Sequence, residues 1–345
     1  MKEIADAFSS PVRPVIALEQ VKTYYPIRSG IFSRVAGYVK AVDDVSFRIY
    51  PRETLGLVGE SGCGKSSLGR TIIGLENITR GQVIFDGENI AGYTHTQMRP
   101  VWKRMQMIFQ DPYSSLNPRK TVENMMEEIL QIHHIVPRNE IRDEIDRILG
   151  LIGLPPDMKK RFPHEFSGGQ RQRISIAKAI TMRPKFLVCD EATSALDVSI
   201  QAQILGLFKE LQAKLGLTCL FISHGLGAVK YISDRIAVMY LGKILELAPA
   251  AEIFIEPRHP YTQALLSAYP DPDPRNRGRE KILLPGSVPS SADPPKGCRF
   301  HTRCPFRKQR CSEQEPLLTG EGPHQTACHF KIKPSDWRAA YSQAV

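Results

Sequence analysis

The sequence predicts one large α/β domain with a mostly parallel sheet, followed by a small cysteine-rich extension. Short apolar, β-rich runs alternate with helical patterns from about Val15 to Ala250, which is the order that strands and crossover helices produce. After Ala250 prolines crowd the chain, long periodic segments stop, and four of the seven cysteines fall in the last fifth. We therefore expect domains at 1–250 and 251–345, and one copy of the large domain because no internal repeat is visible.

The individual elements follow from periodicity and turn chemistry. The clearest strands are predicted at Thr54–Val58, Met105–Phe109, Phe186–Asp190, Thr218–Ser223 and Arg235–Tyr240. Helices are predicted at Val122–Leu130, Arg138–Ile152 and Gly168–Met182. Residues 111–119, which include Pro112, Tyr113 and Ser114, are dense in turn formers and are predicted as a loop. Beyond 250, a run of prolines that includes Pro257, Pro270, Pro272, Pro274 and Pro295 indicates a segment wrapped on the larger domain.

Charge and hydropathy bound the class of protein. Lys plus Arg exceed Asp plus Glu by 46 to 36, a net charge of +10, which suits nucleic acid, an anionic membrane surface or nucleotide phosphates without choosing among them. No apolar run reaches the roughly 20 residues of a membrane helix. The segment 1–6 lacks the basic-then-apolar layout of a secretory signal. We expect a cytosolic chain.

A glycine-rich loop follows the strand Thr54–Val58 and leads into a helical segment, and Ser67, directly after the loop, is predicted to belong to the nucleotide site. The loop residues are Gly59, Glu60, Ser61, Gly62, Cys63, Gly64, Lys65 and Ser66. The spacing is that of the phosphate-binding loop G-x-x-x-x-G-K-[ST], in the required strand–loop–helix context. Backbone N–H groups and the helix dipole favour an anion there. Lys65 is expected to reach the β- and γ-phosphates and Ser66 to ligate Mg²⁺; the alternative is a glycine-rich turn that matches by chance.

Two carboxylates end the strand Phe186–Asp190. A buried strand that ends in Asp190 and Glu191 is costly unless the charges meet a metal or donors. Asp190 fits a Mg²⁺ partner held through water, and Glu191 fits the base that polarises an attacking water. The alternative is a pair of solvated acids at a strand end.

A second anion cradle is predicted at the start of the helix Gly168–Met182. Ser167 is placed as the N-cap, and Gly168, Gly169 and Gln170 follow. A serine and two glycines at a helix N-terminus present backbone donors to phosphate. One nucleotide cannot occupy both cradles of one compact domain unless they face each other. The sequence therefore predicts a head-to-tail pair, in which each chain donates its serine–glycine cradle to the other's ATP.

These motifs, in this order, resemble the ATP-binding-cassette family. They are the loop 59–66, Gln110, the run 166–170, the strand 186–191, the run Ser194-Ala195-Leu196-Asp197, and His224. The resemblance covers about Val15 to Ala250. It implies a P-loop NTPase cassette, with a RecA-like core, an antiparallel β subdomain and a helical subdomain at about 111–182.

The resemblance also implies residue roles. Gln110 is expected to sense the γ-phosphate and Mg²⁺ and to communicate with membrane subunits. Asp197 is expected in the loop that bridges the two chains, and His224 at the γ-phosphate in the transition state. Tyr25 is expected to stack on adenine, with Tyr24 the next choice.

Two positions depart from the family pattern. Ala192 stands where proline is usual, and Gly225 follows His224 where aspartate is common. Neither departure removes a catalytic group. Gly225 allows a looser switch and a weaker or partner-dependent ATPase.

The last part of the chain resembles the extension of ATPases from oligopeptide and dipeptide importers. His259-Pro260-Tyr261 and the residues to 266 carry this resemblance, and the runs 108–112, 115–119 and 197–203 reinforce it. Almost the whole chain is similar to that subfamily, and to the second ATPase of such a pair in particular.

The extension also holds a group of cysteines, Cys298, Cys304, Cys311 and Cys328. In a reducing cytosol such a group indicates metal rather than disulfides. Four thiolates suit Zn²⁺ or an iron–sulfur cluster, and the wide spacings favour [4Fe–4S]; relatives with this extension are known to carry such a cluster. Zn²⁺ and reduced, unligated thiols stay open. Nearby Arg and His side chains are candidate donors to the cluster, which we expect to be a structural staple rather than an electron carrier.

The resemblance implies an importer subunit that hydrolyses MgATP at the cytoplasmic face of the membrane, as a peripheral subunit without nucleic acid. Its implied partners are a paralogous ATPase, two transmembrane permease subunits and a periplasmic or surface solute-binding protein. Di- or oligopeptides are the expected solute, with nickel chelates, glutathione and sugars open. A copy of the chain itself is the open alternative to the paralogue. Two rival functions are a soluble cassette ATPase of DNA repair or ribosomes, and a redox sensor built on the cysteines.

Overall fold

The protein is described by a computed structural model, which covers residues 12–30, 32–111, 115–194, 196–268, 282–320, 322–330 and 332. Pro112, Tyr113, Ser114, Ala195, Pro270, Pro272 and Pro274 from the sequence predictions lie outside the described residues. Within the described part of the chain, two sheets stack through a shared core, and a seven-stranded sheet forms the centre. No helix of this part combines the length and apolarity that crossing a membrane takes.

The central sheet carries the site. Its strands, in spatial order, are β11 (Gln325–Thr326), β10 (Lys243–Pro249), β9 (Arg235–Tyr240), β3 (Thr54–Val58), β8 (Thr218–Ile222), β7 (Phe186–Asp190) and β6 (Met105–Ile108). The five from β9 to β6 are parallel, and β10 and β11 are antiparallel additions at one edge. The carboxyl ends of parallel strands meet at one edge, which is where loops collect functional residues in open α/β sheets.

The five predicted strands are therefore confirmed, three of them to the residue. β6 and β8 each end one residue earlier than predicted. The sequence pattern predicted these strands correctly because they are almost continuously apolar and buried on both faces, as parallel strands between two layers must be.

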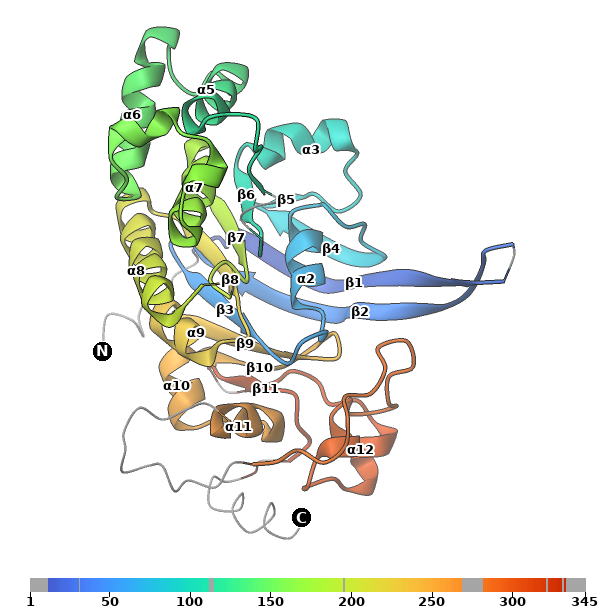
Figure 1. Ribbon diagram of the computed structural model, residues 1–345. Helices are drawn as coiled ribbons and strands as arrows, with labels where there is room; N and C mark the ends of the chain where they lie inside the picture. The colour runs from blue at the N-terminus through green and yellow to red at the C-terminus, as the bar shows by residue number, and fades with distance from the viewer. Residues whose placement is uncertain are drawn as a thin grey trace.

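A smaller antiparallel sheet covers one side. Its order is β2 (Arg34–Ile49), β1 (Ile16–Ser29), β4 (Arg80–Phe85) and β5 (Glu88–Asn89). Figure 1 shows the long β1–β2 hairpin reaching well beyond the rest of the chain. Phe47, Phe85 and Leu57 belong to one buried cluster, so this sheet packs on the central sheet.

Helices cover the central sheet and form two outlying groups. The helices are α2 (Lys65–Ile72), α3 (His95–Trp102), α5 (Val122–His133), α6 (Ile141–Leu151), α7 (Gly168–Thr181), α8 (Val198–Leu215), α9 (Leu226–Ile232), α10 (Ala250–Ile255), α11 (Pro260–Ser267) and α12 (Gln309–Glu313). In Figure 1, α5 and α6 gather at one end of the molecule, and α11 and α12 lie at the opposite end. The predicted helix at 138–152 is a 3₁₀ turn at Arg138–Glu140 followed by α6.

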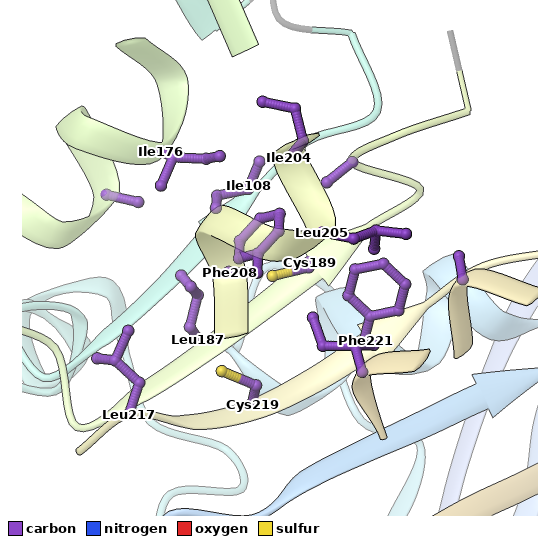
Figure 2. Packing of buried hydrophobic residues seen from close by; sticks show 14 of the residues in the cluster. Ile108, Ile176, Leu187, Cys189, Ile204, Leu205, Phe208, Leu217, Cys219 and Phe221 are labelled. Carbon is purple, nitrogen blue, oxygen red and sulfur yellow. The ribbon is translucent and has the colours of Figure 1, made fainter. Parts of the chain in front are cut away.

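The core between α8 and the sheet fixes the strand ends that carry the site. Figure 2 shows Phe208 and Leu205 of α8 over Cys189 of β7 and Phe221 of β8. The Phe208 and Phe221 rings meet edge to face with centroids 6.1 Å apart. Each such side chain contributes about 1.5–3 kcal/mol by leaving water, and together they hold β7 and β8 in register up to their carboxyl ends.

Among the described residues after 250, none forms a separate sheet. β11 pairs with β10 through Glu246↔Thr326 and Leu247↔Gln325, so the end of the described chain extends the central sheet. The boundary predicted at 250 stays a prediction, while the predicted wrapping is visible in this pairing.

Candidate active site

The phosphate-loop motif lies between β3 and α2, as the sequence predicted. The Lys65 side chain is buried, and its Nζ donates to the carbonyls of Gly59 (2.9 Å) and Glu60 (3.0 Å). Gly64 has a φ of 107°, and a Cβ there would meet the carbonyl oxygen of Ala41 at 2.0 Å. Only glycine fits this left-handed, crowded position. The loop therefore turns tightly and directs Lys65 and the start of α2 to one place.

Two of the three residues predicted at the Mg²⁺ site, which also includes Gln110, are in contact. Ser66 Oγ donates a 2.8 Å hydrogen bond to Asp190 Oδ1 at the end of β7. Asp190 is 2% exposed, and this burial raises the pKa of its carboxyl. A buried carboxylate beside a hydroxyl is an oxygen-only donor set, which suits Mg²⁺ and relieves the cost of burying the charge.

Glu191 lies between the two other predicted catalytic residues. Gln110 Nε2 donates to Glu191 Oε2 at 2.8 Å, and His224 Nδ1 lies 3.4 Å from Glu191 Oε1. Glu191 has a φ of 49°, in the left-handed region, and its N–H donates to the carbonyl of Ile222. A non-glycine residue in this conformation is uncommon and is typical of functional sites. The strand end thus turns the carboxylate toward the loop of Gln110.

The second cradle has the predicted geometry at the start of α7. Ser167 Oγ accepts from the Gln170 N–H, and the Gln170 side chain accepts from the Ser167 N–H, a capping box. Ser167 and Gly168 are exposed. A Cβ at Gly169 would meet Ile200 Cγ2 at 2.6 Å, so the glycine lets α7 and α8 approach. Among the described residues, no hydrogen bond joins this cradle to the loop 59–66.

Asp197 is the N-cap of α8. Its carboxylate accepts from the Ile200 N–H (2.9 Å) and from the Ser199 hydroxyl (2.7 Å). The backbone hydrogen bond from Ile200, followed by the one from Ser199, lowers the pKa of Asp197. Asp197 therefore serves as a charged helix cap in this chain.

Tyr25 and Tyr24 point to opposite faces of β1. Tyr25 is half-buried and lies by Ser67 and Glu76 near the phosphate loop's helix, where burial raises the pKa of its hydroxyl. The Tyr24 hydroxyl donates to Asp43 Oδ1. This alternation of faces along a strand leaves Tyr25 as the tyrosine on the side of α2.

The two departures from the family pattern are accommodated in different ways. Ala192 is buried directly after Glu191. Gly225 precedes α9 with an ordinary φ of −85°, and its N–H donates to Ser223 Oγ at 3.0 Å. His224 itself is 59% exposed, so solvent and ligands reach its ring.

The four cysteines of the extension line one small cavity. Cys298, Cys304, Cys311 and Cys328 share it with Phe300 and His259. Burial raises the pKa of Cys298 to about 11 and that of Cys304 to about 12. In the described part of the chain, no three or more His, Cys, Asp and Glu side chains are close enough to hold a single metal ion.

The sequence did not predict that two buried arginines of the extension point at the cassette. Arg303 Nη1 donates to Glu60 Oε2 at 2.8 Å, and Arg299 pairs with Asp43. Both arginines are thus paired with carboxylates of the cassette. Their signal in the sequence was a basic segment, which does not reveal its partners.

Together the fold and the site define a P-loop ATPase of the ATP-binding-cassette class. The ABC transporter family model matches residues 42–194, and the model of the oligopeptide/dipeptide transporter C-terminal region matches residues 245–311. The chain belongs to the ABC transporter family, on the branch of the oligopeptide transport ATP-binding proteins.

Two curated relatives and one solved structure show how far the similarity extends. The oligopeptide transport ATP-binding protein AppF of Bacillus subtilis is 52% identical over 321 residues, which are 92% of this chain and 97% of that protein. OppF of Salmonella typhimurium is 46% identical over 324 residues, 93% and 97% of the two chains. The structure of cbiO1 from Clostridium perfringens, part of an ABC transporter complex, has a TM-score of 0.61 at 26% identity and covers 70% of this chain and 91% of that chain.

Proposed function

We propose that the chain is the ATP-hydrolysing subunit of a multi-subunit importer that takes up di- or oligopeptides across the cytoplasmic membrane. The observation that carries the proposal is a continuous set of contacts at the ends of β3, β6, β7 and β8. Ser66 contacts Asp190, and Gln110 and His224 flank Glu191. The solute class is supported by the match to the oligopeptide/dipeptide C-terminal region and by the relatives AppF and OppF.

The site residues divide the reaction between them. Lys65 and the loop N–H groups would bind the β- and γ-phosphates. Ser66 and Asp190 would hold Mg²⁺, with Gln110 nearby, and the bound ion neutralises phosphate charge. Glu191 accepts the proton of the attacking water, and its hydrogen bond to Gln110 orients the carboxylate. His224, beside the other Glu191 oxygen, would donate to the γ-phosphate.

The exposed cradle at Ser167 supports a two-chain site. It has donors and a helix dipole, and no hydrogen bond among the described residues links it to the loop 59–66. A second cassette would supply the matching cradle, and Asp197 would lie in the loop between the chains. The relatives' role as transport ATP-binding proteins supports two permease subunits, a paralogous ATPase and a solute-binding protein as further partners, with the chain at the inner membrane face.

A metal centre in the extension is a further part of the proposal. Four cysteine side chains that line one cavity fit a [4Fe–4S] cluster, whose thiolate ligands lie farther apart than those of one Zn²⁺ ion. The cluster would tie together the segments that carry the four cysteines, as structural metals do in small appendages.

Reconstitution tests the function directly. The chain is co-expressed with its membrane partners and uptake of a labelled peptide panel is measured in cells, with the Glu191→Gln chain as the matched control. We expect ATP-dependent uptake that the control lacks. Uptake that persists in the control, or a complex that binds no MgATP, would contradict the proposal.

A further inference from the structure

Glu60, the second residue of the phosphate-binding loop, is held by the C-terminal extension on both its backbone and its side chain. Its N–H donates to the Tyr261 hydroxyl at 2.8 Å. Its Oε2 accepts from Arg303 Nη1 at 2.8 Å. Tyr261 begins α11, and Arg303 lies between the first two cysteines of the extension. Two segments remote in sequence thus converge on one loop residue.

Both partners of Glu60 are rigidly placed. Tyr261 is fully buried, and the Arg303 side chain is 8% exposed, against 26% for Glu60. The Tyr261 ring packs on Tyr240 and Phe300 at centroid distances of 4.7 and 5.4 Å. Hydrogen bonds to charged groups at such largely buried positions are stronger than solvent-exposed ion pairs. The contacts from the extension therefore restrict the position of Glu60 more than contacts with solvent alone would.

Glu60 in turn is joined to Lys65. The Lys65 ammonium donates to the carbonyls of Glu60 and Gly59. Any shift of the Glu60 peptide moves the carbonyl that positions Lys65 and the N–H groups that follow it in the loop. A direct line of contacts therefore runs from Arg303 through Glu60 to the phosphate-binding ammonium.

We infer that Arg303, assisted by Tyr261, is a positioning residue of the ATP site, which preorganises the phosphate-binding loop through Glu60. The inference rests on the proposed nucleotide site. Because Arg303 contacts the loop and not the reacting atoms, its effect belongs to nucleotide affinity rather than to phosphoryl transfer. The extension is then part of the ATPase, and its removal would weaken nucleotide binding.

The test is a double-mutant cycle on the full-length chain with affinity as the readout. MgATP and MgADP dissociation constants are measured for Arg303→Met, Glu60→Gln and the double variant. Each single change should weaken binding about tenfold, the effect of one charge-assisted hydrogen bond. The double variant should bind like the single ones, because both remove one contact. Arg307→Met, which removes an exposed charge of the same extension, is the matched control and should bind normally.

A second readout separates positioning from folding. Arg303→Lys keeps the charge and should recover part of the affinity, and Tyr261→Phe should weaken binding without a change in the thermal midpoint. In the assembled transporter, KM for ATP should rise about tenfold with kcat within about twofold. Wild-type affinity for both Arg303→Met and Glu60→Gln, or losses that add in the double variant, overturns the inference. So does a loss confined to an unfolded Arg303→Met while Glu60→Gln binds normally.

Lys65→Ala distinguishes this inference from the nucleotide site itself. If Lys65→Ala abolishes binding while Arg303→Met and Glu60→Gln bind normally, the site stands and the positioning role is wrong. If Lys65→Ala binds MgATP normally, the proposed function is wrong and the positioning role fails with it.

Discussion

Gln110 Nε2 lies 2.8 Å from Glu191 Oε2. Gln110 follows β6 and precedes the segment that leads to α5, whereas Glu191 directly follows β7 of the central sheet. The bond therefore connects the carboxylate that faces water to the chain entering the outlying helices. A movement of those helices would change the orientation of Glu191, so the contact offers a physical link between the helical region and catalysis.

Glu191→Gln should retain MgATP binding and lose turnover. The amide preserves the shape of the side chain but cannot accept a proton, and general-base catalysis is worth about 10²–10⁴ in rate. Phosphate release by the assembled transporter, with equilibrium nucleotide binding measured in parallel, checks this. Turnover within about threefold of the wild type would remove Glu191 from the role of base.

Ser167 should affect turnover in the complex without affecting nucleotide binding by the single chain. Ser167→Ala removes the cap of α7 and the cradle hydroxyl together, which costs about 1 kcal/mol of helix stability. Ser167→Asp keeps an N-cap acceptor but adds negative charge where phosphate is expected. We expect turnover to fall further in Ser167→Asp than in Ser167→Ala, although thermal unfolding should show the aspartate variant to be the more stable.

The opposite ranking, in which turnover simply follows thermal stability, would assign Ser167 to capping alone. If both variants lost MgATP binding to the same extent in the isolated chain, the cradle would belong to the chain's own nucleotide site. Either result would argue against a site shared between two chains.

Glu144 should stabilise the fold in a pH-dependent way. Its hydrogen bonds to Arg147, and then those to Arg183, lower the pKa of its carboxyl below the ordinary value of 4.5. A lowered pKa means that its contribution is present above the pKa of the unfolded chain and is lost as pH falls through the folded pKa. Both arginines are about half exposed, so we expect Glu144→Gln to cost about 1 kcal/mol at neutral pH.

Thermal unfolding of the wild type and Glu144→Gln across a pH series checks the sign. The difference between the two should be largest near neutral pH and should shrink below about pH 4.5. A difference that is constant over this range would show that packing, and not charge, stabilises this part of α6.

The cysteine centre predicts a visible and analytical signature. Anaerobically purified chain should be brown and contain about four iron and four sulfide per chain, and Cys304→Ser should lose both. Iron and sulfide analysis with visible absorption measures this. A colourless, zinc-containing sample would contradict the iron–sulfur assignment. A sample that contains neither iron nor zinc would show that the four cysteines are reduced, unligated thiols.

The strands and motif loops were predictable because their signals are local. Thr54–Val58 and Phe186–Asp190 are largely apolar runs, and Gly59 and Gly64 of the loop between β3 and α2 occupy positions where a Cβ would clash with backbone carbonyls. The capping box of Ser167 and Gln170 likewise depends on only four consecutive residues. Such features depend on short-range steric effects and hydrogen bonds, which are determined by residues close together in the sequence.

The contacts between remote segments were not predictable. The pairing of β11 with β10, and of Arg303 with Glu60, depends on where a proline-rich segment returns to the sheet. An arginine near cysteines looks the same in sequence whether it faces a cluster, solvent or a carboxylate. Which of Tyr25 and Tyr24 lies on the side of α2 is likewise a matter of register rather than composition, and the stacking of Tyr25 on adenine stays a prediction.

The contact between Glu60 and Arg303 can form only late in the synthesis of the chain. Glu60 and Arg303 are 243 positions apart, and a ribosome adds about 5–20 residues per second. A newly made cassette therefore spends on the order of tens of seconds with its loop 59–66 emerged and Arg303 and β11 not yet made. In the last part of that interval, after β10 is made and before β11 follows, the β10 edge lies open to other chains, so nascent protein that stalls between residues 249 and 325 should need chaperone protection that the finished chain does without.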